Sequence, residues 1–241
     1  MGRAGGAAGP ASAAMASYRR PGPAGGSEVT DPMSADDCSS PVDPHRALSR
    51  LLAHPDGRGP VYTWFGGHGF AVRGDVEPLQ LLFHVEGLEV TAPAVPARRL
   101  LLVRDPASEA LLERRRNPWT GRHCNVELQI QTVTPLPLSP LMPIFVTRDK
   151  VIALLEQHLP GRDSSARQLV ASRAALENER IAAVDYVGTW QTSTAWWPWM
   201  QMEDESGYLF TRMFLRKYAR PGELPPRLKA DIDERFPELL E

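Results

Sequence analysis

Four of the six tryptophans of this chain lie within ten residues of one another, from Trp190 to Trp199. An indole ring offers a large apolar surface and a single N–H donor, which suits the wall of a cavity that holds a flat or apolar ligand. The simpler alternative is that the rings only fill one end of the hydrophobic core. The ligand-binding candidates are the aromatic and amide side chains of Trp64, Trp119, Gln129, Trp190, Trp196, Trp197, Trp199 and Tyr208.

Histidine and glutamate occur together at two places where the sequence has strand character. His84 is two residues from Glu86, and His123 is four residues from Glu127. A histidine and a glutamate that project into one dry cavity form an acid–base pair that works near neutral pH. The alternative is that these side chains face solvent. The catalytic candidates are therefore His84, Glu86, His123 and Glu127.

Other kinds of site find little support in the sequence. The same four side chains would form a mixed metal site only if their strands were neighbours. The chain has no H-x-H or H-E-x-x-H spacing, and we expect no metal. It also lacks a G-x-S-x-G nucleophile motif and a phosphate-binding glycine loop, so we expect no cofactor. Two cysteines, Cys38 and Cys124, build no disulfide framework.

A hairpin with strict alternation is the clearest local pattern. Residues 109–116 lead into the turn Asn117–Gly121, and residues 122–132 form the return strand. Apolar residues of the return strand occupy alternate positions: Cys124, Val126, Leu128 and Ile130. This period of two predicts an antiparallel strand with one buried face. Residues 79–91 follow a similar pattern, with Phe83 and Val85 on one face and His84 and Glu86 on the other.

The remaining elements are read from periodicity and from proline and glycine. A helix is predicted from Pro44, after Asp43 as N-cap, to about His54. We expect strands at 60–65 and 70–73 around a glycine turn, and further strands at 99–104, 186–194 and 208–216. Residues 147–158 have helical spacing, and residues 163–180 have helix-favouring composition. The C-terminal segment should form short helical turns separated by prolines.

These elements predict a mainly β fold with a few short helices. Seven or eight strands follow one another with connections too short for parallel crossovers, so the sheet should be antiparallel. A sheet of this size avoids exposed edges by curling, and we expect a closed or nearly closed, calycin-like β-barrel. Residues 1–43, rich in Gly, Ala and Pro, are expected to be a disordered tail, and residues 44–241 a single barrel domain.

Composition limits the class of partner. The 241 residues include 27 Lys and Arg against 29 Asp and Glu, which gives a net charge of -2. This balance provides no excess of positive charge for nucleic acid, and no apolar run reaches the roughly 20 residues that cross a bilayer. We expect a cytoplasmic protein that binds a hydrophobic small molecule, with no nucleic acid or membrane partner; a homodimer remains open.

Several short motifs occur in the order found in one bacterial family. They are Asn117–Gly121, Gly188-Thr189-Trp190, the segment 196–202, Gly207–Phe210, Leu224-Pro225 and Phe236-Pro237-Glu238. With these motifs the chain resembles the uncharacterised bacterial family known as domain of unknown function eighteen thirty-eight, over about Gly59 to Glu238. It departs from the family pattern at Gln129–Pro140, where four prolines gather in the neighbourhood. The resemblance implies no known catalytic residues.

Three functions remain open at this point. The first is a cofactor-independent cyclase, isomerase or lyase of bacterial secondary metabolism, acting on a polyketide- or terpenoid-like substrate in a tryptophan-lined cavity. The second is a non-catalytic carrier or binding protein that uses the same cavity. The third is a structural or interaction domain in which every tryptophan belongs to the core. Fold alone does not separate them.

Overall fold

The computed structural model of the protein describes residues 43–54, 58–73, 79–93, 95–133, 143–158, 164–178, 180 and 183–241. The chain divides into two compact units, Met1–Ser40 and Pro41–Glu241. All of the described residues belong to the second unit, and the tail expected at 1–43 lies, apart from its last residue, outside them. No helix in the described ranges has the length and apolar character needed to cross a bilayer.

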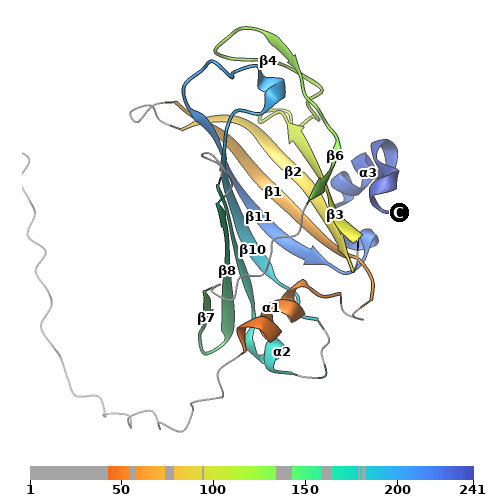
Figure 1. Ribbon diagram of the computed structural model, residues 1–241. Coiled ribbons are helices and arrows are strands. Elements are labelled where there is room, and N and C mark those ends of the chain that lie inside the picture. The colour runs from red at the N-terminus through yellow and green to blue at the C-terminus, as the bar shows by residue number, and fades with distance from the viewer. Residues whose placement is uncertain are drawn as a thin grey trace, which may run out of the picture. The chain divides into compact units, whose positions relative to one another are not determined.

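The second unit is built mainly from antiparallel strands, as predicted (Figure 1). The strands are β1 (Val61–Val72), β2 (Gln80–Ala92), β3 (Val95–Arg104), β4 (Arg114–Arg116), β5 (His123–Asn125), β6 (Ile130–Val133), β7 (Ile144–Val146), β8 (Lys150–His158), β9 (Ser164–Ser172), β10 (Val187–Thr194) and β11 (Tyr208–Tyr218). The α-helices are α1 (Pro44–Leu52), α2 (Arg173–Glu177) and α3 (Pro226–Arg235). Short 3-10 helices are η2 (Pro198–Met200), η3 (Pro221–Glu223) and η4 (Pro237–Leu239).

Nine of the strands form one curved sheet with the order β6-β3-β2-β1-β11-β10-β9-β8-β7. The first strand in the described ranges, β1, pairs with the last, β11, as the first and last strands of a closed barrel do. Of the expected closed or nearly closed barrel, the closed form is wrong for the described residues, because no ladder joins β6 to β7. These two edge strands have only four and three residues. The sequence between them carries several prolines, which have no N–H to donate to a ladder.

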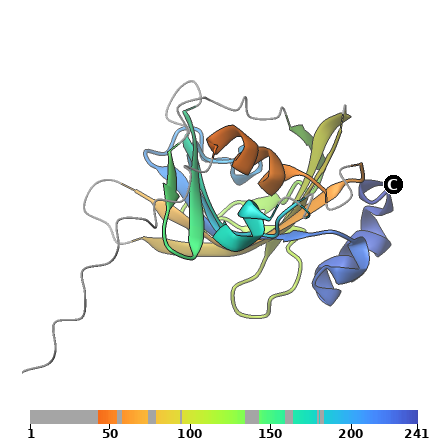
Figure 2. The same ribbon diagram turned by 90° about the horizontal axis from the view of Figure 1, so that it is seen from below.

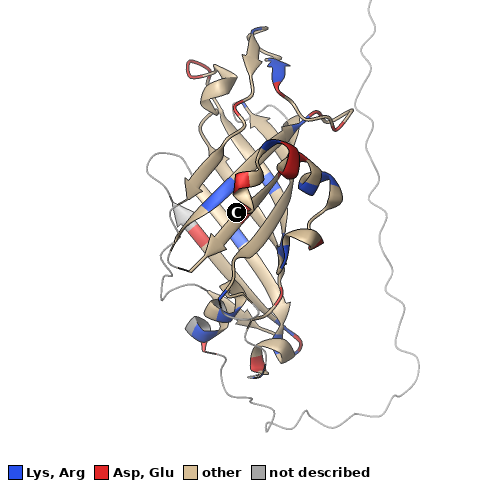
Figure 3. Ribbon diagram, turned by 90° about the vertical axis from the view of Figure 1, so that its right-hand side faces the viewer, with Lys and Arg blue, Asp and Glu red and all other residues tan. Residues whose placement is uncertain are grey.

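Each face of the sheet has its own hydrophobic core. On the inner face, which is the side that α1 covers (Figure 2), the core includes Phe65, Phe83, Leu169, Trp190 and Met213. On the outer face, α3 and η4 pack over a second core that includes Tyr62, Leu88, Leu100, Leu228 and Ile232. Figure 3 shows α3 and the C-terminus lying over this outer face. A side chain can therefore be assigned to one face by its register.

Helix α1 begins as predicted and closes one end of the inner face. It starts at Pro44, and the Asp43 carbonyl accepts a hydrogen bond from Ala47 N at 2.9 Å. Ala47 and Leu51 are buried in the inner core. The Lys217 ammonium of β11 donates to the carbonyls of Leu51 (2.8 Å) and Ala53 (2.5 Å), so it caps the free carbonyls at the helix end.

The helix predicted over 147–158 is wrong, because residues 150–158 form β8, the partner strand of β7. Val151, Leu154 and Leu155 have helical spacing, but Val151, Ala153 and Leu155 also alternate. The second set is buried in the inner core. Pairing with β9 along nine residue pairs, from Lys150–Ser172 to His158–Ser164, outweighs local preference. Within 163–180, where the composition favours a helix, residues 164–172 form β9 and only residues 173–177 form the short helix α2.

The glycine turn predicted at 66–69 is also wrong, since β1 runs unbroken from Val61 to Val72. The glycines serve close packing instead. A Cβ atom on Gly67 would meet the Arg212 carbonyl oxygen of β11 and lie 2.7 Å from the Met213 Cα. A Cβ atom on Gly69 would meet the Phe83 ring of β2. In β1, glycine therefore marks a close approach of neighbouring groups.

Candidate functional site

The structure places the first pair of catalytic candidates on the outer face. His84 of β2 lies directly opposite His68 of β1, and the two imidazole ring centroids are 4.7 Å apart. Burial and the neighbouring His84 lower the pKa of His68. The next outer-face position on β2 is Glu86. These groups therefore do not point into the interior, where an acid–base pair was expected.

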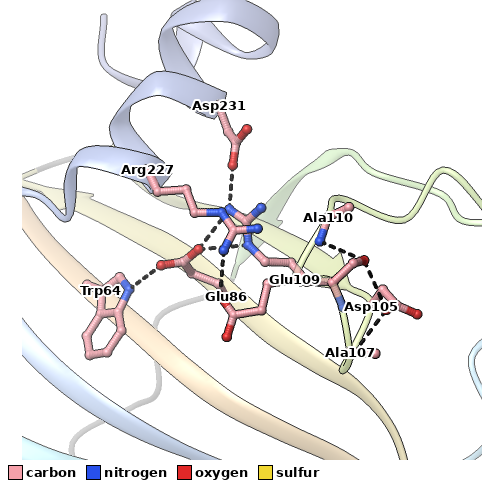
Figure 4. Close-up of polar contacts among 10 residues, drawn as sticks. Trp64, Glu86, Asp105, Ala107, Glu109, Ala110, Arg227 and Asp231 are labelled. Carbon is pink, nitrogen blue, oxygen red and sulfur yellow. Dashed lines mark hydrogen bonds and ion pairs between the residues drawn. The ribbon is translucent and has the colours of Figure 1, made fainter.

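Glu86 takes part in a polar network between the sheet and α3 (Figure 4). Its carboxylate accepts hydrogen bonds from Arg104 Nε at 2.9 Å and from Trp64 Nε1 at 3.2 Å. Arg104, which is buried, also pairs with Asp231 of α3. Two of the site candidates, Glu86 and Trp64, thus help to attach the C-terminal helix to the outer face.

The second pair of candidates faces solvent. His123 and Glu127 are exposed, and so is the ligand-binding candidate Gln129, whereas Cys124 and Val126 are buried. The strand predicted over 122–132 is interrupted, because β5 ends at Asn125 and β6 begins at Ile130 in the other, nine-stranded sheet, but the predicted alternation of buried and exposed residues holds over 123–127. The described geometry therefore matches the alternative in which the polar set of this strand faces water.

The tryptophans near η2 pack against one another and against Phe83 of β2. Trp197 stacks on Phe83 with ring centroids 5.3 Å apart, and Trp199 lies 6.1 Å from Trp197. Trp119 from the hairpin turn lies 6.1 Å from Trp196, whose N–H donates to the Glu205 carbonyl at 3.0 Å.

The space between these rings is small. A cavity lined by Phe83, Trp119 and Trp199, among others, has about 10 Å³, which is room for about one water molecule. Tyr208, the last ligand-binding candidate, is half-buried at the start of β11, opposite Val72. In the described residues the four rings around η2 therefore pack on one another and on Phe83.

A different set of residues meets on the inner face and was not among the candidates, apart from Trp190. The Glu89 carboxylate receives two hydrogen bonds from Arg167, at 3.1 and 2.9 Å from Nη1 and Nη2. It also receives two from Arg99, at 2.8 Å from Nε and 2.5 Å from Nη2. The guanidinium carbons of Arg99 and Arg167 lie 4.7 and 4.2 Å from the Trp190 ring centroid. We call these four residues the Arg–Glu–Arg cluster.

Strand register explains why these side chains meet. Glu89 of β2 is the direct cross-strand partner of Arg99 of β3, and Trp190 of β10 is the direct partner of Arg167 of β9. Directly opposite residues project to the same face at close range. Trp190 is oriented further by a 2.8 Å hydrogen bond to Ser165 Oγ and by an edge contact with Phe65.

Burial makes the electrostatics of the cluster strong. Burial alone would raise the pKa of Glu89, but the adjacent Arg167 and Arg99 guanidinium groups lower it to about 2. Burial lowers the pKa of Arg99 despite the favourable effect of Glu89. For Arg167 the attraction to Glu89 exceeds the effect of burial, and the pKa is raised. The Glu89 carboxyl group is therefore ionised at neutral pH, and the two guanidinium groups keep their positive charge, since arginine does not lose its proton in proteins.

The cluster has one buried donor without an acceptor. The Nε atom of Arg167 is buried, and no acceptor among the described residues lies within hydrogen-bonding distance of it. A buried N–H without a partner costs about 1–3 kcal/mol. Arg167 therefore has one N–H group that makes no hydrogen bond to a described residue.

The sequence did contain a signal for this cluster. Glu89 is in phase with Phe83 and Val85, which are buried on the inner face. Arg167 shares its face of β9 with Leu169 and Ala171, which follow at every second residue. This alternation can be recognised only when the segment is treated as a strand. A charged residue at a core position of an alternating strand is the pattern that indicates a buried polar site.

A family model described as protein of unknown function (DUF1838) matches residues 162–241. The predicted resemblance to this family is thus confirmed for the C-terminal third of the chain, which contains Arg167, Trp190 and the tryptophans near η2. The motifs before residue 162 lie outside the match. Searches of curated proteins and of solved structures found no match.

Proposed function

We propose that this protein binds a small molecule on the inner face of its curved sheet and holds it without converting it, as a carrier does. The observation that carries the proposal is the Arg–Glu–Arg cluster. Three charged groups in an apolar interior cost desolvation free energy that apolar side chains of similar size would not. Buried charged groups with perturbed pKa values are a pattern typical of functional sites, and this supports ligand binding.

The apolar part of the ligand would lie against the residues next to the cluster. Leu101 follows Arg99 on the inner face of β3, and Leu169 follows Arg167 on that of β9. Leu155 of β8 is the direct cross-strand partner of Arg167. Together with Trp190 these side chains form the apolar surroundings of the polar cluster.

The geometry supports a carrier better than a cyclase, isomerase or lyase. A catalytic base works best when its pKa is close to the operating pH, and the pKa of Glu89 is about 2. The four groups first considered for acid–base work are on the outer face or face solvent. An enzyme acting on a polyketide- or terpenoid-like compound would need a different proton donor or acceptor on the inner face.

Fluorescence with a neutral apolar probe tests the proposal. We expect N-phenyl-1-naphthylamine to bind in a saturable way and to change the tryptophan emission. The change should be lost in Trp190→Phe and kept in Trp64→Phe, which removes an indole from the outer face. Circular dichroism checks that both variants fold.

Three outcomes of this titration decide the proposal. Non-saturable partitioning, or an equal loss of the emission change in both variants, would contradict it. Binding should also survive in His84→Ala, Glu86→Gln, His123→Ala and Glu127→Gln. Loss of binding in any one of these four folded variants would argue that the ligand lies elsewhere.

A further inference from the structure

The charges of the Arg–Glu–Arg cluster are not balanced. Two guanidinium groups face one carboxylate, so the cluster has a net charge of +1. Among the described residues, the titratable groups that act on these arginines are each other, Glu89 and, for Arg167, the hydroxyl of Tyr186, which carries no charge at neutral pH. An uncompensated charge in an interior of low dielectric constant is costly, and a bound anion would remove that cost.

The cluster also offers free donors. Arg99 uses Nε and Nη2 for Glu89, and no described residue accepts a hydrogen bond from its Nη1. Arg167 uses Nη1 and Nη2, and its buried Nε has no acceptor in the described part of the chain. Guanidinium groups bind carboxylate, sulfonate and phosphate oxygens through such N–H groups.

Another buried cation on the same face shows what a purely structural role looks like. Lys217 has three hydrogen-bond acceptors, the carbonyls of Leu51, Ala53 and Val184, which match the three N–H groups of its ammonium. The Lys217 site is complete without a ligand. The cluster at Arg99 and Arg167 is not.

We infer that the ligand is an organic acid with one negatively charged group, and that Arg99 and Arg167 bind this group on the inner face. The inference rests on the proposed binding function. The net charge of +1 matches a monoanion. Trp190 and the neighbouring leucines match a flat apolar body attached to that anion.

Two probes that share one aromatic body test the inference. 8-Anilinonaphthalene-1-sulfonate has the body of N-phenyl-1-naphthylamine and adds a sulfonate. We expect the sulfonate probe to bind about tenfold more tightly, since one charge-assisted hydrogen bond contributes that much or more. Naphthalene-2-carboxylate should displace it more effectively than the neutral naphthalene-2-carboxamide, which tests the same preference with a carboxylate.

The variant Arg99→Gln gives the sharpest test. It keeps the ion pair between Glu89 and Arg167, whose net charge is zero, so we expect the variant to fold. It also removes the excess positive charge. We expect the sulfonate probe to lose its tenfold advantage while the neutral probe binds as before. The matched control is Arg212→Gln, which removes an exposed guanidinium of β11 opposite His68 on the outer face. Glu89→Gln raises the charge to +2, and where it folds it should bind the sulfonate more tightly.

The outcomes separate this inference from the proposed function. The two probes could bind equally tightly while the change in emission still depends on Trp190. This result would overturn the anion inference and leave the carrier proposal standing. Binding of neither probe would overturn both. Loss of the preference in Arg212→Gln instead of Arg99→Gln would place the anion on the outer face and overturn the inference. Displacement of the sulfonate probe by millimolar inorganic sulfate would show a site for free anions and contradict an organic ligand.

Discussion

Glu89 of β2 and Arg167 of β9 form a two-point ion pair across the inner face, with N···O distances of 3.1 and 2.9 Å. These strands are four positions apart in the sheet order. In a flat sheet they would be about 19 Å apart. The pair is thus a product of the curvature that Figure 2 shows, and it connects the two halves of the sheet.

Acid should weaken this connection. The pKa of Glu89 is about 2 in the folded protein, below the ordinary 4.5. A carboxylate with a lowered pKa stabilises the fold fully above pH 4.5. This stabilisation is lost as the pH falls from 4.5 towards 2. The loss amounts to about 3 kcal/mol. Urea unfolding at several pH values should show it in the wild type, and Glu89→Gln should lack that part of the pH dependence. Identical slopes in both proteins would contradict the assignment.

Alkaline pH should have the opposite effect through Lys217. Burial lowers the pKa of this lysine to about 8, although Asp185 acts against the shift. Between pH 8 and 10.5 the unfolded chain therefore holds more protons than the folded one, so stability rises with pH. The rise should be present in the wild type and absent in Lys217→Met, measured by urea unfolding. Lys229→Met removes a partly exposed lysine that pairs with Asp233, and it should keep the rise.

Local patterns predicted those elements whose periodicity has a single interpretation. The alternation at 123–127, the strands β10 and β11, and the proline start of α1 are of this kind. Residues 150–158 fit both a helix and a strand, and only pairing with β9 decides between them. Glu89 and Arg167 are 78 residues apart in sequence, and sheet curvature brings them together. The curvature of the sheet cannot be predicted from any local sequence pattern.

The hairpin turn depends on one buried amide. Asn117 Oδ1 accepts hydrogen bonds from the N–H groups of Trp119 (2.9 Å) and Thr120 (3.1 Å). Its Nδ2 donates to the Met200 carbonyl of η2 at 2.9 Å. Asn117→Ala would leave buried groups without partners, and we expect a loss of about 2 kcal/mol in the free energy of unfolding. Asn125→Ala, an exposed position of β5, should change it by less than about 0.5 kcal/mol.

A second variant at the same residue separates the turn from the bridge to η2. Asn117→Asp keeps the acceptor for the two turn N–H groups but has no amide to donate to Met200. It should unfold more easily than the wild type and show altered tryptophan emission near η2. An Asn117→Asp protein with wild-type stability and emission would show that the bridge contributes nothing.

Close packing in β1 predicts a difference between two glycines. A Cβ atom on Gly67 would meet the backbone of β11 at the Arg212 carbonyl and at the Met213 Cα, and backbone cannot move aside as a side-chain end can. Gly67→Ala should therefore force β1 and β11 apart and lower the free energy of unfolding by about 3 kcal/mol. Gly222→Ala is the matched control, because a Cβ atom there has nothing within 4 Å. Urea unfolding of the two variants measures the difference. Equal stabilities would mean that β1 and β11 are not held as close as the register requires.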